Sequence, residues 1–139
     1  MLYELIYYSK AVLNSEDYDI ESILETAREF NAKHHITGCL LFHNNQFLQI
    51  LEGDFDRINA LYKSIRTDKR HHSVITLCMR EINTLSFRNW SMAYQKFTND
   101  SIKSTLGIDD FHKIIESENF GKTSKDIFKK ISNTILETS

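Results

Sequence analysis

Two periodicities of hydrophobic and polar residues divide the first two-thirds of the chain into alternating predicted strands and helices. Short segments rich in aliphatic and aromatic residues predict strands. They cover residues 2–9, 36–42, 47–51, 74–77 and 87–94. Apolar residues three and four positions apart predict a helix over residues 19–31 and a second one that starts at Asp54. Their apolar stripes are Ile20, Ile23, Leu24 and Ala27, and Ile58, Leu61, Tyr62 and Ile65.

Local signals support the predicted boundaries between these elements. Asn tolerates a positive φ angle, so the pair Asn44-Asn45 predicts a tight hairpin turn between two strands. Asp54 follows Gly53 and is a candidate N-cap of the second helix. The resulting order, β-α-β-β-α-β-β, contains the ferredoxin-like split βαβ unit. We therefore predict an α+β fold in which right-handed crossovers place both helices on one face of the sheet.

The chain becomes polar after about Tyr94, with apolar residues spaced as in helices. One predicted helical stripe is Ile108, Phe111, Ile114 and Ile115, and the other is Ile127, Phe128, Ile131 and Ile135. Gly121 lies between them as a candidate helix terminator. We interpret residues 1–95 as the main domain and residues 96–139 as a helical extension. The extension is expected to cover the open face of the sheet, or to dock a partner or a second copy.

Composition and charge exclude several classes of function. The 139 residues are 41% hydrophobic and carry a formal charge of −2, so a basic nucleic-acid-binding surface is not expected. No apolar run is long enough to span a membrane, and the N-terminus does not resemble a signal peptide. Cys39 and Cys78 form no CxxC motif, so free thiols in a cytoplasmic protein without a metal site are the expectation.

Three polar residues occupy positions that the periodicity assigns to the interior. Gln49 shares a strand face with Phe47 and Leu51 because side chains alternate along a strand. Tyr7 lies on the apolar face of the first strand, and Asn31 continues the stripe of the first helix. Taken singly, each is most simply a structural residue bonded to its neighbours. Together they would line a slot between the two helices that fits a planar polar ligand.

Five segments carry a resemblance to a known family. They are LIYYS at residues 5–9, ITG at 36–38, FLQILEG at 47–53, DKRH at 68–71 and WSM at 90–92. In this order and spacing they resemble the BLUF family of blue-light sensors, which use a flavin, typically FAD. The resemblance covers residues 1 to about 95. It implies a ferredoxin-like domain with the isoalloxazine ring held between the two helices, and FMN or riboflavin as alternative flavins.

The resemblance assigns roles to three interior residues. Tyr7 matches the photoactive tyrosine of the family and Gln49 its switching glutamine. Asn31 matches the asparagine that hydrogen-bonds the C4=O and N3 edge of the flavin. It implies that the excited flavin takes an electron and a proton from Tyr7, with Gln49 relaying the proton. The hydrogen bonds of Gln49 are then rearranged toward the C4=O, which shifts the visible absorption to the red.

Four further positions match the family. Arg70 and His71 match residues near the other polar edge of the flavin and the phosphate side. Trp90 and Met92 match strand residues whose position responds to light. The chain departs from several members because Tyr8 directly follows Tyr7; by strand alternation it faces the other side of the sheet.

The resemblance implies a photoreceptor without catalytic turnover and without an attached effector domain. Its output is then expected to pass through the last strand and the C-terminal helices to another protein, and self-association into a homo-oligomer is expected. Two alternatives remain open at this stage. One is a small enzyme that uses the slot for a substrate, with Tyr7 or His71 as acid. The other is a binding or assembly module whose photochemistry has been lost.

Overall fold

The computed structural model describes residues 1–12 and 17–138 of the chain. Its elements follow the predicted order β-α-β-β-α-β-β and continue with three helices. In chain order they are β1 (Leu2–Ala11), α1 (Asp17–Lys33), β2 (Thr37–His43), β3 (Gln46–Asp54), α2 (Phe55–Thr67), β4 (His71–Glu81), β5 (Ala93–Lys96), α3 (Asn99–Leu106), α4 (His112–Glu116) and α5 (Phe120–Thr138). None of the helices in the described part of the chain is long and apolar enough to cross a membrane.

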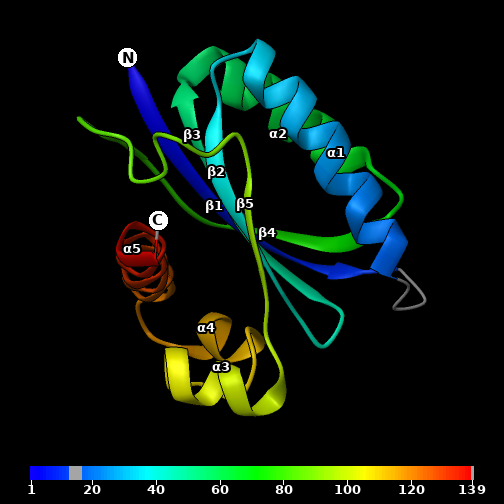
Figure 1. Ribbon diagram of the computed structural model, residues 1–139, viewed down its shortest axis with the longest axis vertical. Coiled ribbons are helices and arrows are strands. Elements are labelled where there is room, and N and C mark those ends of the chain that lie inside the picture. Colours follow the sequence, from blue (N-terminus) through cyan, green and yellow to red (C-terminus); the bar gives the residue numbers. More distant parts are fainter. Residues whose placement is uncertain (13–16, 139) are drawn as a thin grey trace.

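The strands form one five-stranded sheet in the order β4-β1-β3-β2-β5. β2 and β5 pair in parallel, whereas the pairs β1–β3, β1–β4 and β2–β3 are antiparallel. Figure 1 shows α1 and α2 together on one face of this sheet and α3, α4 and α5 on the other. The predicted ferredoxin-like arrangement, with the C-terminal helices on the second face, is therefore confirmed.

Each face of the sheet has its own hydrophobic core. Beneath α1 and α2 the core contains Leu5, Tyr7, Leu24, Leu51, Ile58 and Met92. Beneath the C-terminal helices it contains Ile6, Tyr8, Leu48, Ile50, Phe111 and Phe128. Alternating residues of β1 and β3 thus enter different cores, as the pleat of a strand requires. Both faces of β1 and β3 are buried over most of their length, including polar residues such as Glu4 and Glu52.

The turn and cap predictions are confirmed. Asn44 and Asn45 have φ angles of 49° and 59° and connect β2 to β3. Asp54 is extended, and its carboxylate accepts a hydrogen bond from the backbone N–H of Asp56 at 3.2 Å, which caps α2. The hairpin sets the register in which Leu40 pairs with Gln49, so these local signals help to position the interior polar residues.

The prediction of a strand over residues 87–94 is wrong for most of its length. β5 contains only Ala93–Lys96, where the backbone pairs with β2. Phe87 and Trp90 lie in a turn, in which the Trp90 N–H donates to the Phe87 carbonyl at 2.9 Å. Met92 also precedes the strand. The apolar character of this segment reflects burial of Phe87 and Met92 in two different cores rather than strand pairing.

The tail differs from the prediction in three ways. α4 contains only His112–Glu116, so Ile108 and Phe111 of the first predicted stripe precede it. α3 was not predicted because it buries only Ile102 and therefore has no apolar stripe, although Thr98 and Ser101 form a capping box at its start. Gly121 does not terminate a helix but lies in the first turn of α5. A Cβ atom there would lie 3.1 Å from the carbonyl oxygen of Leu77, so the glycine permits close packing of α5 on β4. The side chain of Ile135, part of the predicted stripe, lies outside the described residues.

Candidate functional site

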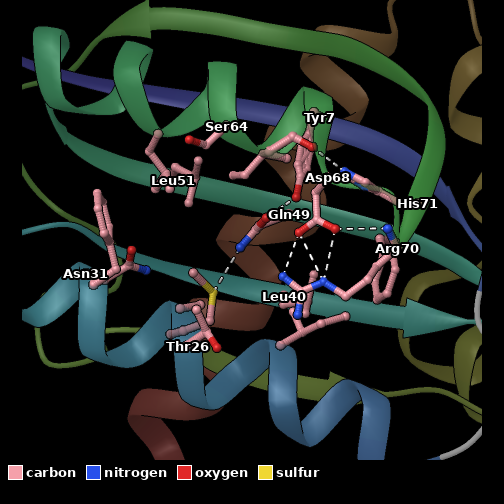
Figure 2. Close-up of a pocket in the computed structure, with 17 residues that line it drawn as sticks. Tyr7, Thr26, Asn31, Leu40, Gln49, Leu51, Ser64, Asp68, Arg70 and His71 are labelled. Carbon is pink, nitrogen blue, oxygen red and sulfur yellow. Dashed lines mark hydrogen bonds and ion pairs between the residues drawn. The ribbon is translucent and has the colours of Figure 1, made fainter.

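A cavity of about 250 Å³ lies between α1, α2 and the sheet. Its walls are mostly apolar side chains of the two helices and the sheet, among them Ile23, Ala27, Leu40, Leu51, Leu61 and Ile65. Tyr7, Asn31, Gln49, Arg70 and His71 also line it, as Figure 2 shows. Met92 is a further lining residue. The slot expected from the sequence is therefore present, and six of the seven predicted site residues border it.

Tyr7, Gln49 and Met92 form a continuous chain of side-chain contacts. Tyr7 and Gln49 are directly paired residues of β1 and β3, so their side chains leave the sheet side by side on the same face. The Tyr7 hydroxyl donates to Gln49 Oε1, and Gln49 Nε2 donates to Met92 Sδ at 3.3 Å. Tyr7 is 4% exposed and Gln49 is 6% exposed. The amide thus accepts from a phenol on one side and donates to a weak sulfur acceptor on the other.

The environment of Tyr7 holds its phenol in the neutral form. Burial, reinforced by the nearby Tyr62 and Asp68, raises the pKa of Tyr7 far above its ordinary value. The ring stacks on Tyr62, with centroids 5.4 Å apart and an interplanar angle of 18°. Tyr62 is in turn fixed by a hydrogen bond of 2.7 Å between its hydroxyl and Thr76 Oγ1. Tyr7 is therefore a positioned, protonated donor.

Asn31 faces the cavity from α1 with half of its amide unsatisfied. The side chain is 1% exposed, and its Nδ2 donates to the Ser91 carbonyl at 2.7 Å. Its Oδ1 is buried and has no hydrogen-bond partner among the described residues. An acceptor without a partner in such a place carries a free-energy cost of about 1–3 kcal/mol, which a bound donor would remove.

The opposite end of the cavity carries an ion pair that the sequence did not predict. Arg70 Nε and Nη2 donate to the two carboxylate oxygens of Asp68 at 2.6–3.1 Å. The hydrogen bond from Arg70 lowers the pKa of Asp68, so the carboxylate is charged at neutral pH. Asp68 stood within one of the quoted motifs, but nothing in its local pattern distinguished it from a loop residue. The pair gives this end of the cavity both a donor and an acceptor.

His71 and Trp90 are placed differently from the other predicted residues. Both ring nitrogens of His71 have protein partners: Nδ1 lies 2.8 Å from Ser9 Oγ and Nε2 lies 2.5 Å from the Ile65 carbonyl oxygen. His71 therefore borders the cavity with its ring rather than with a free nitrogen. Trp90 does not line the cavity and is 38% exposed, so Met92 and not Trp90 is the residue of this segment that faces the slot.

Sequence comparison decides the family. Residues 2–93 match the family described as sensors of blue-light using FAD, the BLUF family. The chain belongs to the BLUF family. The photoactivated adenylate cyclase subunit beta of Euglena longa is 38% identical over 89 residues, which are 63% of this chain but only 10% of that protein.

Solved BLUF structures share the fold over nearly the whole chain. The dark-state structure of BlrB, a BLUF protein, superposes with a TM-score of 0.80 at 24% identity and covers 96% of each chain. The photo-activated state of BlsA gives a TM-score of 0.77 at 28% identity and covers 92% of this chain and 95% of that one. The similarity therefore includes the helices on the second face of the sheet.

The residues of this BLUF cavity fit a flavin ring. Apolar side chains from two helices enclose a slot suited to a planar ring. Asn31 Oδ1, which has no partner within the described part of the chain, suits a ring N–H donor. The volume of about 250 Å³ is slightly below the range of about 300–1,000 Å³ typical of small-molecule pockets. It is suited to the ring system rather than to a complete dinucleotide. No group of three or more potential metal-ligating side chains occurs among the residues that the structure describes.

Proposed function

We propose that this chain is a blue-light photoreceptor in which Tyr7 and Gln49 carry out the primary reaction on a bound flavin. The observation that carries the proposal is the buried chain of contacts from Tyr7 through Gln49 to Met92 at the wall of the cavity. When bound, the flavin supplies the absorption of blue light and an excited state that accepts an electron. FAD is the proposed flavin, with FMN and riboflavin as the alternatives to be separated by analysis of the released cofactor.

Asn31 and Arg70 are the proposed polar anchors of the ring at opposite ends of the cavity. Asn31 Oδ1 has no hydrogen-bond partner among the residues that the structure describes and is available to accept from a ring N–H. Arg70 is oriented by its bidentate pairing with Asp68, which leaves a charged donor group at the far end. The ring of His71 contacts the aromatic side chains there rather than donating, since its nitrogens are already paired.

Tyr7 is the proposed electron and proton donor. Because burial raises the pKa of Tyr7, the phenol does not lose its proton by ordinary titration. Removal of an electron makes a phenol strongly acidic, so the proton then leaves toward the acceptor already in place, Gln49 Oε1. Tyr7 regains the electron and a proton when the charges recombine. The net result is a changed amide rather than a consumed reactant.

Gln49 is the proposed switch because a single amide holds both an acceptor and a donor. If its donor and acceptor ends are exchanged by rotation or tautomerisation, the hydrogen bond from Nε2 to Met92 Sδ is lost. Met92 then lacks its polar contact in the cavity. We infer that the light signal leaves the flavin site through Met92 and the adjoining β5, which lies beside β2 at the edge of the sheet.

The proposed output is a change in the position of the C-terminal helices, which alters the surface available to a protein partner. β2 contributes to both cores, so a displacement next to it reaches the face covered by α3, α4 and α5. We propose that the chain acts by contact rather than by catalytic turnover, and that it self-associates. Size-exclusion chromatography with light scattering, in darkness and under blue light, tests the self-association.

The decisive experiment is a visible absorption spectrum of the purified protein in darkness and immediately after blue light. A flavin spectrum that shifts to the red and recovers in darkness is expected. Tyr7→Phe and Gln49→Leu should both keep the flavin and lose this shift. Tyr8→Phe is the matched control, because Tyr8 lies in the other core. A static flavin spectrum would indicate an assembly module, and a colourless protein that does not take up FAD would revive the enzyme alternative.

A further inference from the structure

Three consecutive backbone carbonyls, those of Trp90, Ser91 and Met92, are each held by a donor from outside their own segment. The Gly38 N–H donates to the Trp90 carbonyl at 3.1 Å. Asn31 Nδ2 donates to the Ser91 carbonyl at 2.7 Å, and Arg28 Nε donates to the Met92 carbonyl at 3.0 Å. The segment before β5 is thus fastened to α1 and β2 at three successive points.

This segment needs such donors because it is not part of the sheet. The strand pairing of β5 with β2 starts only at Ala93, which pairs with Cys39. Met92 is buried against Gln49, but its backbone lies in a bend directly before the strand. A backbone without ladder hydrogen bonds takes its position from side-chain donors. Of the three donors, Arg28 is the one that bonds to the carbonyl of Met92, the residue whose sulfur contacts Gln49.

The guanidinium of Arg28 suits a hydrogen bond that stabilises one position of the Met92 backbone but can also break. A guanidinium N–H donates a charge-assisted hydrogen bond, which is stronger than a bond between neutral groups. Arg28 itself is exposed, so water competes for the same donor and weakens the net interaction. A bond of this kind biases a two-state segment without locking it in one state.

We propose that Arg28 is a positioning residue whose hydrogen bond to the Met92 carbonyl holds Met92 against Gln49. The bond thereby favours the arrangement of residues 90–92 seen in this structure, which the proposal assigns to the dark state. The inference rests on the proposed function for its consequence in the photocycle. Its structural part, the fastening of the segment by the Arg28 Nε donor, stands independently of light. Arg28 acts through Met92 and does not line the cavity.

A matched pair of variants isolates the donor. Arg28→Gln places an amide N–H at the same distance along the side chain as Nε but removes the charge, whereas Arg28→Met keeps a similar length without any donor. Arg57→Met is the control, since Arg57 Nη1 donates to another carbonyl, that of His34, at 2.9 Å on an exposed surface. The readouts in darkness are hydrogen exchange of the Gly38 amide, which is bonded to the Trp90 carbonyl, and fluorescence of Trp90, the single tryptophan.

Arg28→Met is expected to speed the exchange of the Gly38 amide by roughly three- to tenfold and to shift the Trp90 emission. It should also slow the dark recovery of the red-shifted form by roughly threefold or more, because the lost bond favours the arrangement to which the segment returns. Arg28→Gln should bring the Gly38 exchange, the Trp90 emission and the dark recovery most of the way back to those of the unaltered chain, and Arg57→Met should change none of the three.

Two results would overturn the proposal. One is an Arg28→Met variant with unchanged Gly38 exchange and unchanged recovery, and the other is an Arg28→Gln variant that is affected as strongly as Arg28→Met. Failure of the proposed function looks different: the unaltered chain would then show no red shift. The exchange and fluorescence of the variants would still decide whether Arg28 fastens the segment.

Discussion

Tyr7 and Tyr8 are adjacent residues of β1, yet their side chains lie in separate cores on opposite faces of the sheet. The hydroxyl of Tyr7 donates to Gln49, whereas the hydroxyl of Tyr8 is buried without a hydrogen-bond partner among the described residues. The two phenols therefore differ in whether their hydroxyl groups are hydrogen-bonded. The Tyr7 hydroxyl is a hydrogen-bonded donor at the cavity, whereas the Tyr8 hydroxyl is buried in an apolar core with no described partner.

This difference predicts that Tyr8→Phe increases the free energy of unfolding. Removal of a buried hydroxyl without a partner relieves a desolvation cost, so a gain of about 1 kcal/mol is expected. Urea denaturation followed by circular dichroism measures it. Tyr7→Phe is the comparison, because it removes a satisfied hydrogen bond and should not stabilise the chain. A destabilised Tyr8→Phe would show that the hydroxyl has a partner after all.

Substitution of Glu52 is expected to lower the free energy of unfolding. Its carboxylate is fully buried and accepts from the backbone N–H groups of Ser86 and Phe87 at 2.8 and 2.9 Å, and from Thr37 Oγ1 at 2.9 Å. In Glu52→Gln one of the two oxygens becomes an NH₂ group that faces another donor. We expect a loss of about 1–3 kcal/mol in the free energy of unfolding.

The control for this change is Thr37→Val, which removes only one of the three donors and should cost less. Because Ser86 and Phe87 begin the segment that leads to Trp90, Glu52→Gln should also increase the hydrogen exchange of residues 86–90. Equal costs for the two variants would mean that the backbone contacts of Glu52 contribute little.

Glu52 should also make the free energy of unfolding depend on pH. Burial raises the pKa of Glu52 above its ordinary value of 4.5, although the hydrogen bonds from Ser86, Phe87 and Thr37 oppose the shift. Between pH 4.5 and the raised pKa, the folded chain holds a proton that the unfolded chain has lost. The contribution of this group to the free energy of unfolding therefore falls as the pH rises through that window. Urea titrations at several pH values should show this slope in the native chain and not in Glu52→Gln.

Removal of the Tyr62 ring is expected to disturb the orientation of Tyr7. The two rings stack, and the Tyr62 hydroxyl contacts Thr76. Tyr62→Phe keeps the stacked ring and should leave the photocycle nearly unchanged, whereas Tyr62→Leu removes the aromatic surface against which Tyr7 is held. We expect a lower yield of the red-shifted form in Tyr62→Leu, measured by flash spectroscopy. Equal yields in the two variants would show that the stacking does not position Tyr7.

Sequence by itself determined the elements whose patterns are local. The alternation within β1 and β3 placed Tyr7 and Gln49 on one face and Tyr8 on the other, since successive side chains of a strand point to opposite sides. The Asn44-Asn45 turn and the Asp54 cap were equally local, because they depend on the φ preferences and hydrogen bonding of a few adjacent residues.

Tertiary structure alone decided the segment between β4 and β5 and the residues that hold it. Arg28 and Glu52 bond to backbone groups 34–64 positions away, and no local periodicity encodes such a partner. The same holds for the choice of Met92 over Trp90 at the cavity, which depends on where strand pairing with β2 begins. Hydrophobic periodicity specifies which face of an element is buried, whereas the partner of each polar group is fixed only when the elements pack together.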